Sequence, residues 1–129
     1  MNQTALPLLL SSVLLAACGP DQIVADLPSP NGRYHVEVRK CPQSGALTWS
    51  EKLQVSVLEP GQSAECQSAL NPLVQFDTAA PENQLQLEWL SDHELRAWHP
   101  DFTADAGPAA ATYKHDVPIR LVFMPKALF

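Results

Sequence analysis

The sequence predicts an all-β domain, built as a small antiparallel sandwich, a meander or an open barrel of five to seven strands. Two observations predict this class. Apolar residues recur at every second position in several short segments, which is the pattern of strands with one buried face. Turn sequences containing Pro, Gly, Asn or Asp separate these segments, and prolines recur in the last third of the chain, where they would interrupt a helix.

The alternation identifies each expected strand in turn. Tyr34, Val36 and Val38 form the first apolar stripe, and their neighbours in sequence are polar. Similar stripes, together with a short apolar run at 73–76, predict the other strands at 53–57, 85–89, 94–99 and 119–123. No helix longer than two turns is expected. Residues 104–113 are rich in alanine, but Gly107-Pro108 within them favours a loop.

Turn-forming residues stand where these strands should end. Ser29-Pro30-Asn31-Gly32 precedes the first strand, Pro60-Gly61 follows the second, and Ser91-Asp92-His93-Glu94 joins the pair at 85–99. Each of these sequences is rich in the residue types that tight turns favour.

The first 17 residues have the composition of an export signal. They carry no charged side chain, and residues 6–17 are apolar except for two serines. A run of about 12 residues is too short to cross a bilayer, which needs about 20. A buried core helix is the alternative, but Pro7 and the polar switch at Gly19-Pro20-Asp21 favour a secretory signal.

Leu15-Ala16-Ala17-Cys18 resembles the lipobox of bacterial lipoproteins. The resemblance implies cleavage between Ala17 and Cys18, a diacylglyceryl group on the Cys18 thiol and acylation of the new amino group. Residues 1–17 would then be the signal peptide, 18–30 the lipidated cysteine with a Pro-rich tether, and 31–129 a single β domain. Gly19 follows the cysteine, where lipoproteins of the inner membrane often carry Asp, so the resemblance favours the outer membrane, with the domain facing the periplasm. The alternative is that Cys18 is an ordinary core thiol.

Cys41 and Cys66 remain as an even pair if Cys18 carries lipid. A metal site or a redox pair is the alternative, but the chain has no C-x-x-C sequence, and its histidines stand at no familiar metal-ligand spacing. In an oxidising compartment the pair predicts a structural disulfide. No metal and no cofactor is expected.

Two further motifs resemble known sequences. Residues 29–34 (SPNGRY) are similar to the S-P-D-G-K-Y opening of β-propeller repeats and of small bacterial lipoproteins, and residues 89–95 (WLSDHEL) are similar to a W-x-S-D-x-x-L hairpin in the same proteins. The chain has one copy of each, which is too little for a propeller. The resemblance to the small lipoproteins, whose function is unassigned, implies fold and location but no activity.

The sequence offers one candidate binding surface. On the strand at 94–99, Leu95 and Ala97 share one face and Arg96 and Trp98 share the other, with Phe102 close by. If the first pair faces the core, Arg96, Trp98 and Phe102 could form a contact surface for another protein. The alternative is that a second sheet or the loop at 100–116 covers them.

Catalytic motifs are lacking. Residues 61–65 (GQSAE) begin like a nucleophile elbow but lack its second glycine. A net charge of −6, with scattered basic residues, argues against a nucleic-acid partner. We therefore expect a non-enzymatic, lipid-anchored envelope protein that acts through a protein partner or as structural support. The alternative is a binder of a small ligand or a peptidoglycan fragment.

Overall fold

The structure is a computed structural model that describes residues 22–42, 51–79, 81–102, 107–108 and 110–126. These residues form eight strands and one short 3-10 turn, η2 (Glu82–Gln84). The strands are β1 (Gln22–Pro28), β2 (His35–Pro42), β3 (Glu51–Leu58), β4 (Val74–Ala79), β5 (Gln86–Trp89), β6 (Glu94–Trp98), β7 (Ala111–Tyr113) and β8 (Arg120–Val122).

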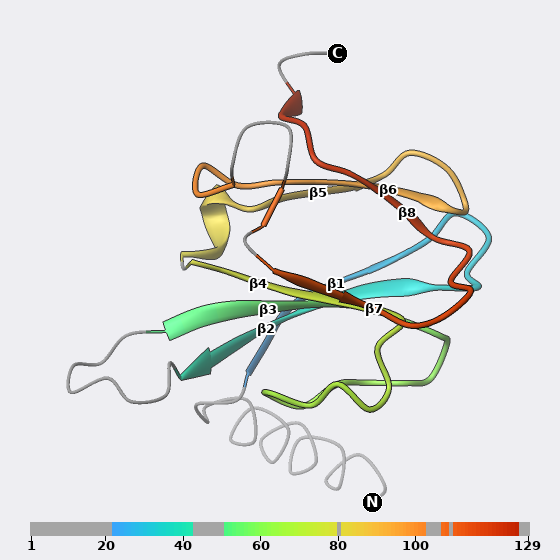
Figure 1. Cartoon of the computed structure of the whole chain (residues 1–129), viewed down its shortest axis with the longest axis horizontal. Helices are drawn as coiled ribbons and strands as arrows, with labels where there is room; N and C mark the ends of the chain where they lie inside the picture. Colours follow the sequence, from blue (N-terminus) through green and yellow to red (C-terminus); the bar gives the residue numbers. More distant parts are fainter. Residues whose placement is uncertain (1–21, 43–50, 80, 103–106, 109, 127–129) are drawn as a thin grey trace, which may run out of the picture.

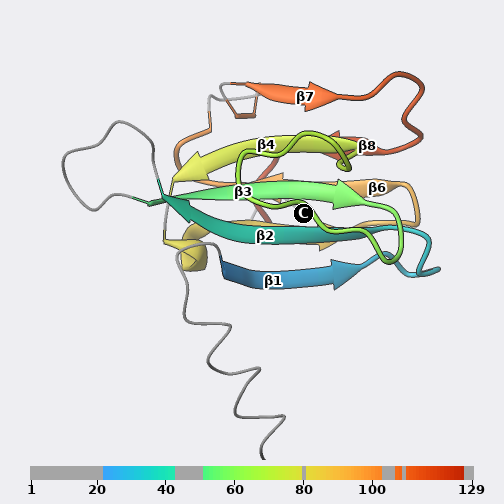
Figure 2. The same ribbon diagram turned by 90° about the horizontal axis from the view of Figure 1, so that it is seen from below.

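The strands form two layers. A five-stranded antiparallel sheet has the order β1-β2-β3-β4-β7, and a three-stranded sheet has the order β5-β6-β8. Figure 1 shows the small sheet lying over one face of the large one. Figure 2 shows β1 and β7 at the two edges of the large sheet. The pair β6–β8 is parallel, whereas the other pairs are antiparallel. The all-β prediction is confirmed, with one strand more than the largest number expected. No helix among the described residues is long and apolar enough to cross a membrane.

The core lies between the two sheets and is made by the predicted stripes. From the large sheet, Val36, Val38, Leu53, Val55 and Val57 are fully buried, and Leu95, Ala97 and Ile119 meet them from the other layer. Phe76, Phe102 and Phe123 fill one region of the core with mutual edge-to-face contacts, at ring-centre distances of 5.7–6.1 Å. Alternation therefore predicted which side chains face inward.

Part of the segment predicted as a tether, residues 18–30, is a strand, because Gln22–Pro28 forms β1. This strand pairs antiparallel with β2, from Gln22 opposite Lys40 to Pro28 opposite His35. Its pairing shifts between Ile23 and Ala25, and this irregularity breaks the period of two by which strands are recognised. Val24 and Ala25 pack against the core, so the strand belongs to the folded domain.

The second additional strand is β7, in the alanine-rich segment. Ala111–Tyr113 pairs with β4 and is exposed along its length. The strand is only three residues long, and its sequence carries no apolar alternation. Neighbouring Gly107 and Pro108 lie outside any strand, as the loop interpretation expected.

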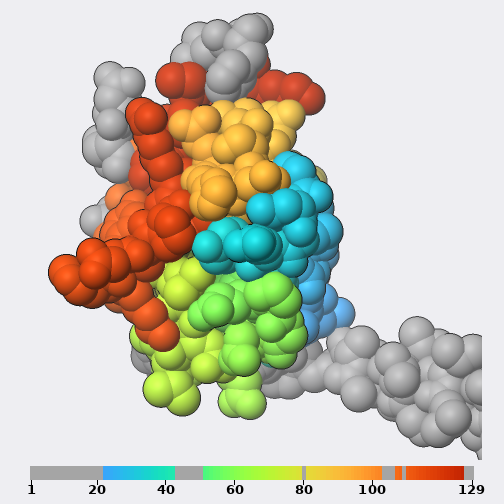
Figure 3. Space-filling model, turned by 90° about the vertical axis from the view of Figure 1, so that its right-hand side faces the viewer, coloured from blue at the N-terminus to red at the C-terminus, as the bar shows by residue number. Residues whose placement is uncertain are grey.

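The predicted turns form as expected. The Gly32 amide donates to the Ser29 carbonyl at 2.9 Å, and the Gln62 amide donates to that of Glu59 at 3.1 Å. Gly32 and Gly61 adopt positive φ angles of 73° and 78°, which glycine accepts without strain. The first turn also contacts the β5–β6 turn, since the Asn31 amide donates to the Asp92 carboxylate at 2.9 Å. Figure 3 shows the two turns, cyan and orange, packed side by side at one end of the molecule.

Candidate functional site

The outer face of the large sheet is covered by a loop, residues 59–73, which connects β3 to β4. Figure 1 shows this green loop on the side of the sheet opposite the small sheet. The predicted disulfide is present: Cys41 at the end of β2 is bonded to Cys66 in the loop, with 5.7 Å between the Cα atoms. It closes a separation of 25 residues, which in the chain-entropy model stabilises the fold by roughly 3 kcal/mol.

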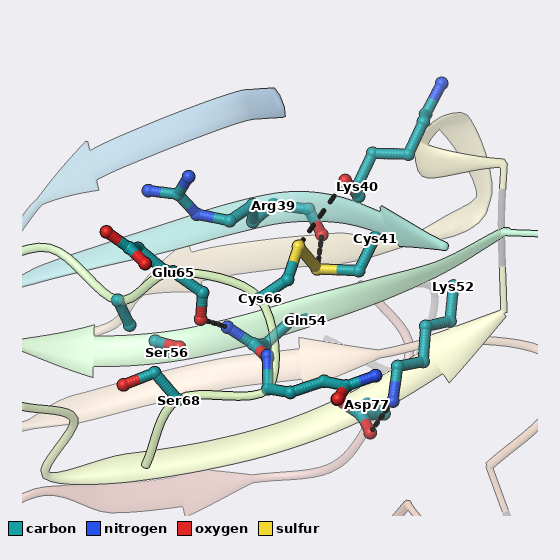
Figure 4. The surroundings of a disulfide bond; sticks show 12 residues. Arg39, Lys40, Cys41, Lys52, Gln54, Ser56, Glu65, Cys66, Ser68 and Asp77 are labelled. Atoms are coloured by element: carbon teal, nitrogen blue, oxygen red, sulfur yellow. Dashed lines mark hydrogen bonds and ion pairs between the residues drawn. A yellow bond between two sulfur atoms is a disulfide. The ribbon is translucent and has the colours of Figure 1, made fainter. Parts of the chain in front are cut away.

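Gln54 on β3 holds the same loop from the sheet beneath it. Its side-chain amide donates to the Glu65 carbonyl at 2.9 Å (Figure 4). Its side-chain oxygen accepts from the Gln67 amide at 2.7 Å. Gln67 has a positive φ of 65°. Gln75 on β4 adds a bond to the Ser68 carbonyl at 2.8 Å. The part of the loop that these bonds hold belongs to no strand. The side chains of Gln54 and Gln75 therefore supply hydrogen-bond partners for its backbone groups.

Polar side chains fill the space between the large sheet and the 59–73 loop, and we call them the polar layer. A buried carboxylate lies at its centre. Glu37 on β2 is 3% exposed, and its oxygens accept from the Ser63 hydroxyl at 2.7 Å and the Ala64 amide at 3.1 Å. Arg39, two residues along the same strand, donates to Glu37 at 3.3 Å and to Ser63 at 2.9 Å. The charge is thus compensated by an ion pair and by hydrogen bonds, as a buried carboxylate requires.

His35 connects the loop to the edge strand β1. Its Nδ1 lies 2.7 Å from the Asp26 carboxylate, and its Nε2 lies 2.9 Å from the Gln62 carbonyl oxygen. Both ring nitrogens of His35 are thus in contact, one with β1 and the other with the 59–73 loop.

A shallow depression of about 610 Å³ lies above these groups. It is lined by Asp26, Pro28, Gly32, Tyr34, His35, Glu37, Pro60, Gly61, Gln62 and Ser63. Three titratable side chains of the layer, Asp26, His35 and Glu37, therefore converge on one hollow of the surface. This convergence makes the depression the best candidate for a ligand site.

The geometry of the depression does not pair a nucleophile with a histidine base. The Ser63 hydroxyl donates to Glu37 and accepts from Arg39, whereas His35 contacts Asp26 and Gln62. Each of these contacts joins two parts of the fold. The arrangement can present polar groups to a ligand, but it forms no serine-histidine pair of the kind that acyl transfer uses. No group of three His, Cys, Asp or Glu side chains in the described ranges is arranged to hold a metal ion.

The predicted surface of Arg96, Trp98 and Phe102 is not assembled. Arg96 is only 2% exposed: its guanidinium donates to Glu88 at 3.1 Å, to Gln86 at 2.8 Å and to the Met124 carbonyl at 2.8 Å. Phe102 turns into the core against Phe76, and Trp98 is half-buried. The expectation of a shared exposed surface is therefore corrected, because the chain after β8 covers the outer face of β6.

Sequence reasoning missed Glu37, Arg39 and Gln54 as buried groups, since polar residues at alternate strand positions usually face solvent. Ala17, Cys18 and the predicted cleavage site lie outside the described residues. No family model, no curated protein and no solved structure matches this chain.

Proposed function

We propose that the chain is an exported lipoprotein whose β domain is held at the cell envelope by lipid on Cys18 and acts without catalysis, through a protein partner or as structural support. The observation that carries this proposal is Leu15-Ala16-Ala17-Cys18, directly after an apolar stretch of export-signal length. The domain would face the periplasm. Gly19, in place of the Asp that follows the cysteine in many inner-membrane lipoproteins, favours the outer membrane.

The disulfide supports the exported location. Cys41–Cys66 ties the 59–73 loop to the sheet, and such bonds persist in oxidising compartments. The polar layer supports a non-enzymatic role, since Glu37, Arg39 and Ser63 hydrogen-bond to one another and hold the loop.

Replacement of Cys18 tests the proposal. In bacteria fed a labelled fatty acid, the wild-type chain should take up label and begin at Cys18, whereas Cys18→Ala should remain unlabelled. The matched control is the double variant Cys41→Ala/Cys66→Ala, which loses the disulfide and should keep the label. A wild-type chain isolated from its envelope with a free Cys18 thiol would refute the proposal.

A second candidate function is the binding of a small polar ligand, such as a peptidoglycan fragment, in the depression. The observation that favours it is the presence of the Tyr34 ring beside Asp26 and Gln62 in one hollow, because an aromatic ring with polar neighbours suits a sugar or a peptide. Titration with soluble muropeptides should shift the NMR signals of Tyr34 and Gln62 while leaving those of Tyr113, on the far edge of the sheet, in place. Unchanged signals at millimolar fragment would exclude this function.

A further inference from the structure

Among the described residues the sandwich is open along one side, where the outer edges of β1 and β5 lie next to each other without a further strand. Two contacts close the ends of this side. The Trp89 indole donates to the Leu27 carbonyl at 2.9 Å at one end, and Lys40 pairs with Glu82 at 3.2 Å at the other. Between them lies a groove of about 190 Å³, lined by Val24, Ala25, Leu27, Val38, Glu82, Leu85 and Leu87. We call this surface, from β1 to β5, the open side.

Two large apolar side chains of β1 reach solvent. Leu27, 38% exposed, lines the groove, whereas Ile23, 47% exposed, lies opposite Arg39 near the start of the strand and outside the groove. They project from opposite faces of β1, and both belong to the edge strand that borders the open side. The carboxylates near them have hydrogen-bonding or charged partners, since Asp26 contacts a ring nitrogen of His35 at 2.7 Å and Glu82 pairs with Lys40. This pairing matters in a chain with a net charge of −6, because unpaired carboxylates would be repelled by anionic lipids.

The position of the anchor limits how far the open side can lie from a membrane. Only residues 19–21 separate Cys18 from Gln22, the first residue of β1. Four residue steps of extended chain span at most about 14 Å. A lipid-bearing Cys18 sits at the bilayer interface, so β1 begins within that distance of the headgroups, and Ile23 lies one step further on.

We infer that the open side is the membrane-contacting surface of the domain, and that Ile23 and Leu27 enter the boundary between headgroups and acyl chains of the bilayer that holds the anchor. This inference rests on the proposed lipidation of Cys18. Burial of exposed apolar groups at that boundary is favourable, and the short link keeps them beside it. Contact with the headgroup layer also shields the edge of β1 that has no strand partner in the described part of the chain, where another strand could otherwise pair.

Site-specific photocrosslinking tests the inference in the full chain. A benzophenone amino acid replaces Ile23, Leu27 or, as the control, Leu70, which is 80% exposed in the 59–73 loop. After illumination of intact cells, phospholipid adducts should be at least about fivefold more abundant at positions 23 and 27 than at position 70, because only the open side lies at the interface. Equal yields at the three positions, or protein adducts alone at 23 and 27, would overturn the inference. Folding of each variant is checked by an intact Cys41–Cys66 bond.

Hydrogen exchange tests the same surface without a bulky substitution. The lipidated wild-type chain in phospholipid nanodiscs is compared with a soluble Cys18→Ser chain. Exchange at β1 should slow at least about threefold in the nanodisc, while exchange at β7, the other edge strand of the sheet, should stay the same. Equal slowing at β1 and β7, or none at β1, would contradict the inference. An unlabelled Cys18 in the wild-type chain would instead overturn the proposed function, so the two failures can be told apart.

Discussion

The indole nitrogen of Trp89 donates a hydrogen bond to the carbonyl oxygen of Leu27 at 2.9 Å, and so joins β5 of the small sheet to β1 of the large one. The two residues are 62 positions apart in sequence. Within the described ranges neither strand has a second strand neighbour at this edge, so the side-chain bond joins two layers that no backbone hydrogen bonds between strands connect there.

Replacing Trp89 by Phe should remove this bond while keeping most of the apolar ring. We expect the free energy of unfolding to fall by about 1 kcal/mol, which is the usual net value of one hydrogen bond. Urea unfolding measures the loss, and hydrogen exchange should show it concentrated at β1. Trp98→Phe, the same change on β6, is the control and should leave exchange at β1 unaltered; equal acceleration by both variants would show that the Leu27 contact is not responsible.

Glu37→Ala should be among the most destabilising single changes in the large sheet. It leaves the Arg39 guanidinium without its carboxylate partner in a buried layer and frees the Ser63 and Ala64 donors. We expect a loss of roughly 3 kcal/mol in the free energy of unfolding. The control is Asp77→Ala, which breaks the Lys52–Asp77 pair at 2.9 Å on the exposed surface, where the loss should stay below about 1 kcal/mol. Comparable losses would contradict the structural role assigned to Glu37.

Gly107→Ala should destabilise the domain more than Gly32→Ala. Both glycines have positive φ angles, 77° and 73°, so alanine is strained by about 1 kcal/mol at either position. At Gly107 the new methyl group would also overlap the Phe123 ring, whereas at Gly32 it meets open space. We expect an additional loss of about 2 kcal/mol at position 107. Thermal unfolding of the two variants checks this difference, and equal melting temperatures would show that the Phe123 ring does not pack there.

Glu82 should make the stability of the domain depend on pH in the acid range. Its own backbone amide, and then Lys40, hold the pKa of this carboxyl below the ordinary value of 4.5. A lowered pKa in the folded state contributes stability that is complete above the unfolded pKa and is lost as the pH falls through the folded one. Glu82→Gln should therefore lower stability at neutral pH but not at strongly acid pH, as measured by urea unfolding across this range.

An NMR titration separates the two causes of this pKa shift. In Lys40→Met the pKa of Glu82 should rise toward 4.5 but remain below it, since the larger cause, the backbone amide, is retained. A full return to the ordinary value would mean that Lys40 alone lowers it.

Much of the fold could be predicted because the apolar pattern is local. Val36, Val38 and Val57 alternate with polar neighbours, and the same residues are buried between the sheets. Gly32 and Gly61 stand in turns that need positive φ, and the turns form there. β1 and β7 were missed for local reasons too, since one has an irregular register and the other spans three exposed residues.

The burial of the polar layer could be predicted from the sequence, but only by combining the strand period with the disulfide. Period two places His35, Glu37, Arg39 and Cys41 on one face of β2. A disulfide from Cys41 must bring Cys66 over that face, so the chain around position 66 covers Glu37 and Arg39. Treating the disulfide as a constraint on which face is covered, as well as on loop length, would have predicted a buried ion pair.

By itself the sequence determined the strand faces, the turns and the cysteine pair, because each depends on residues close together or on a simple count. Only the tertiary structure decided what covers each face. The 59–73 loop buries Glu37, the Met124 carbonyl meets Arg96, and Gln22–Pro28 joins the sheet as β1. Alternation states which side chains share a face, but whether solvent or another segment lies against that face depends on contacts between residues far apart in the chain.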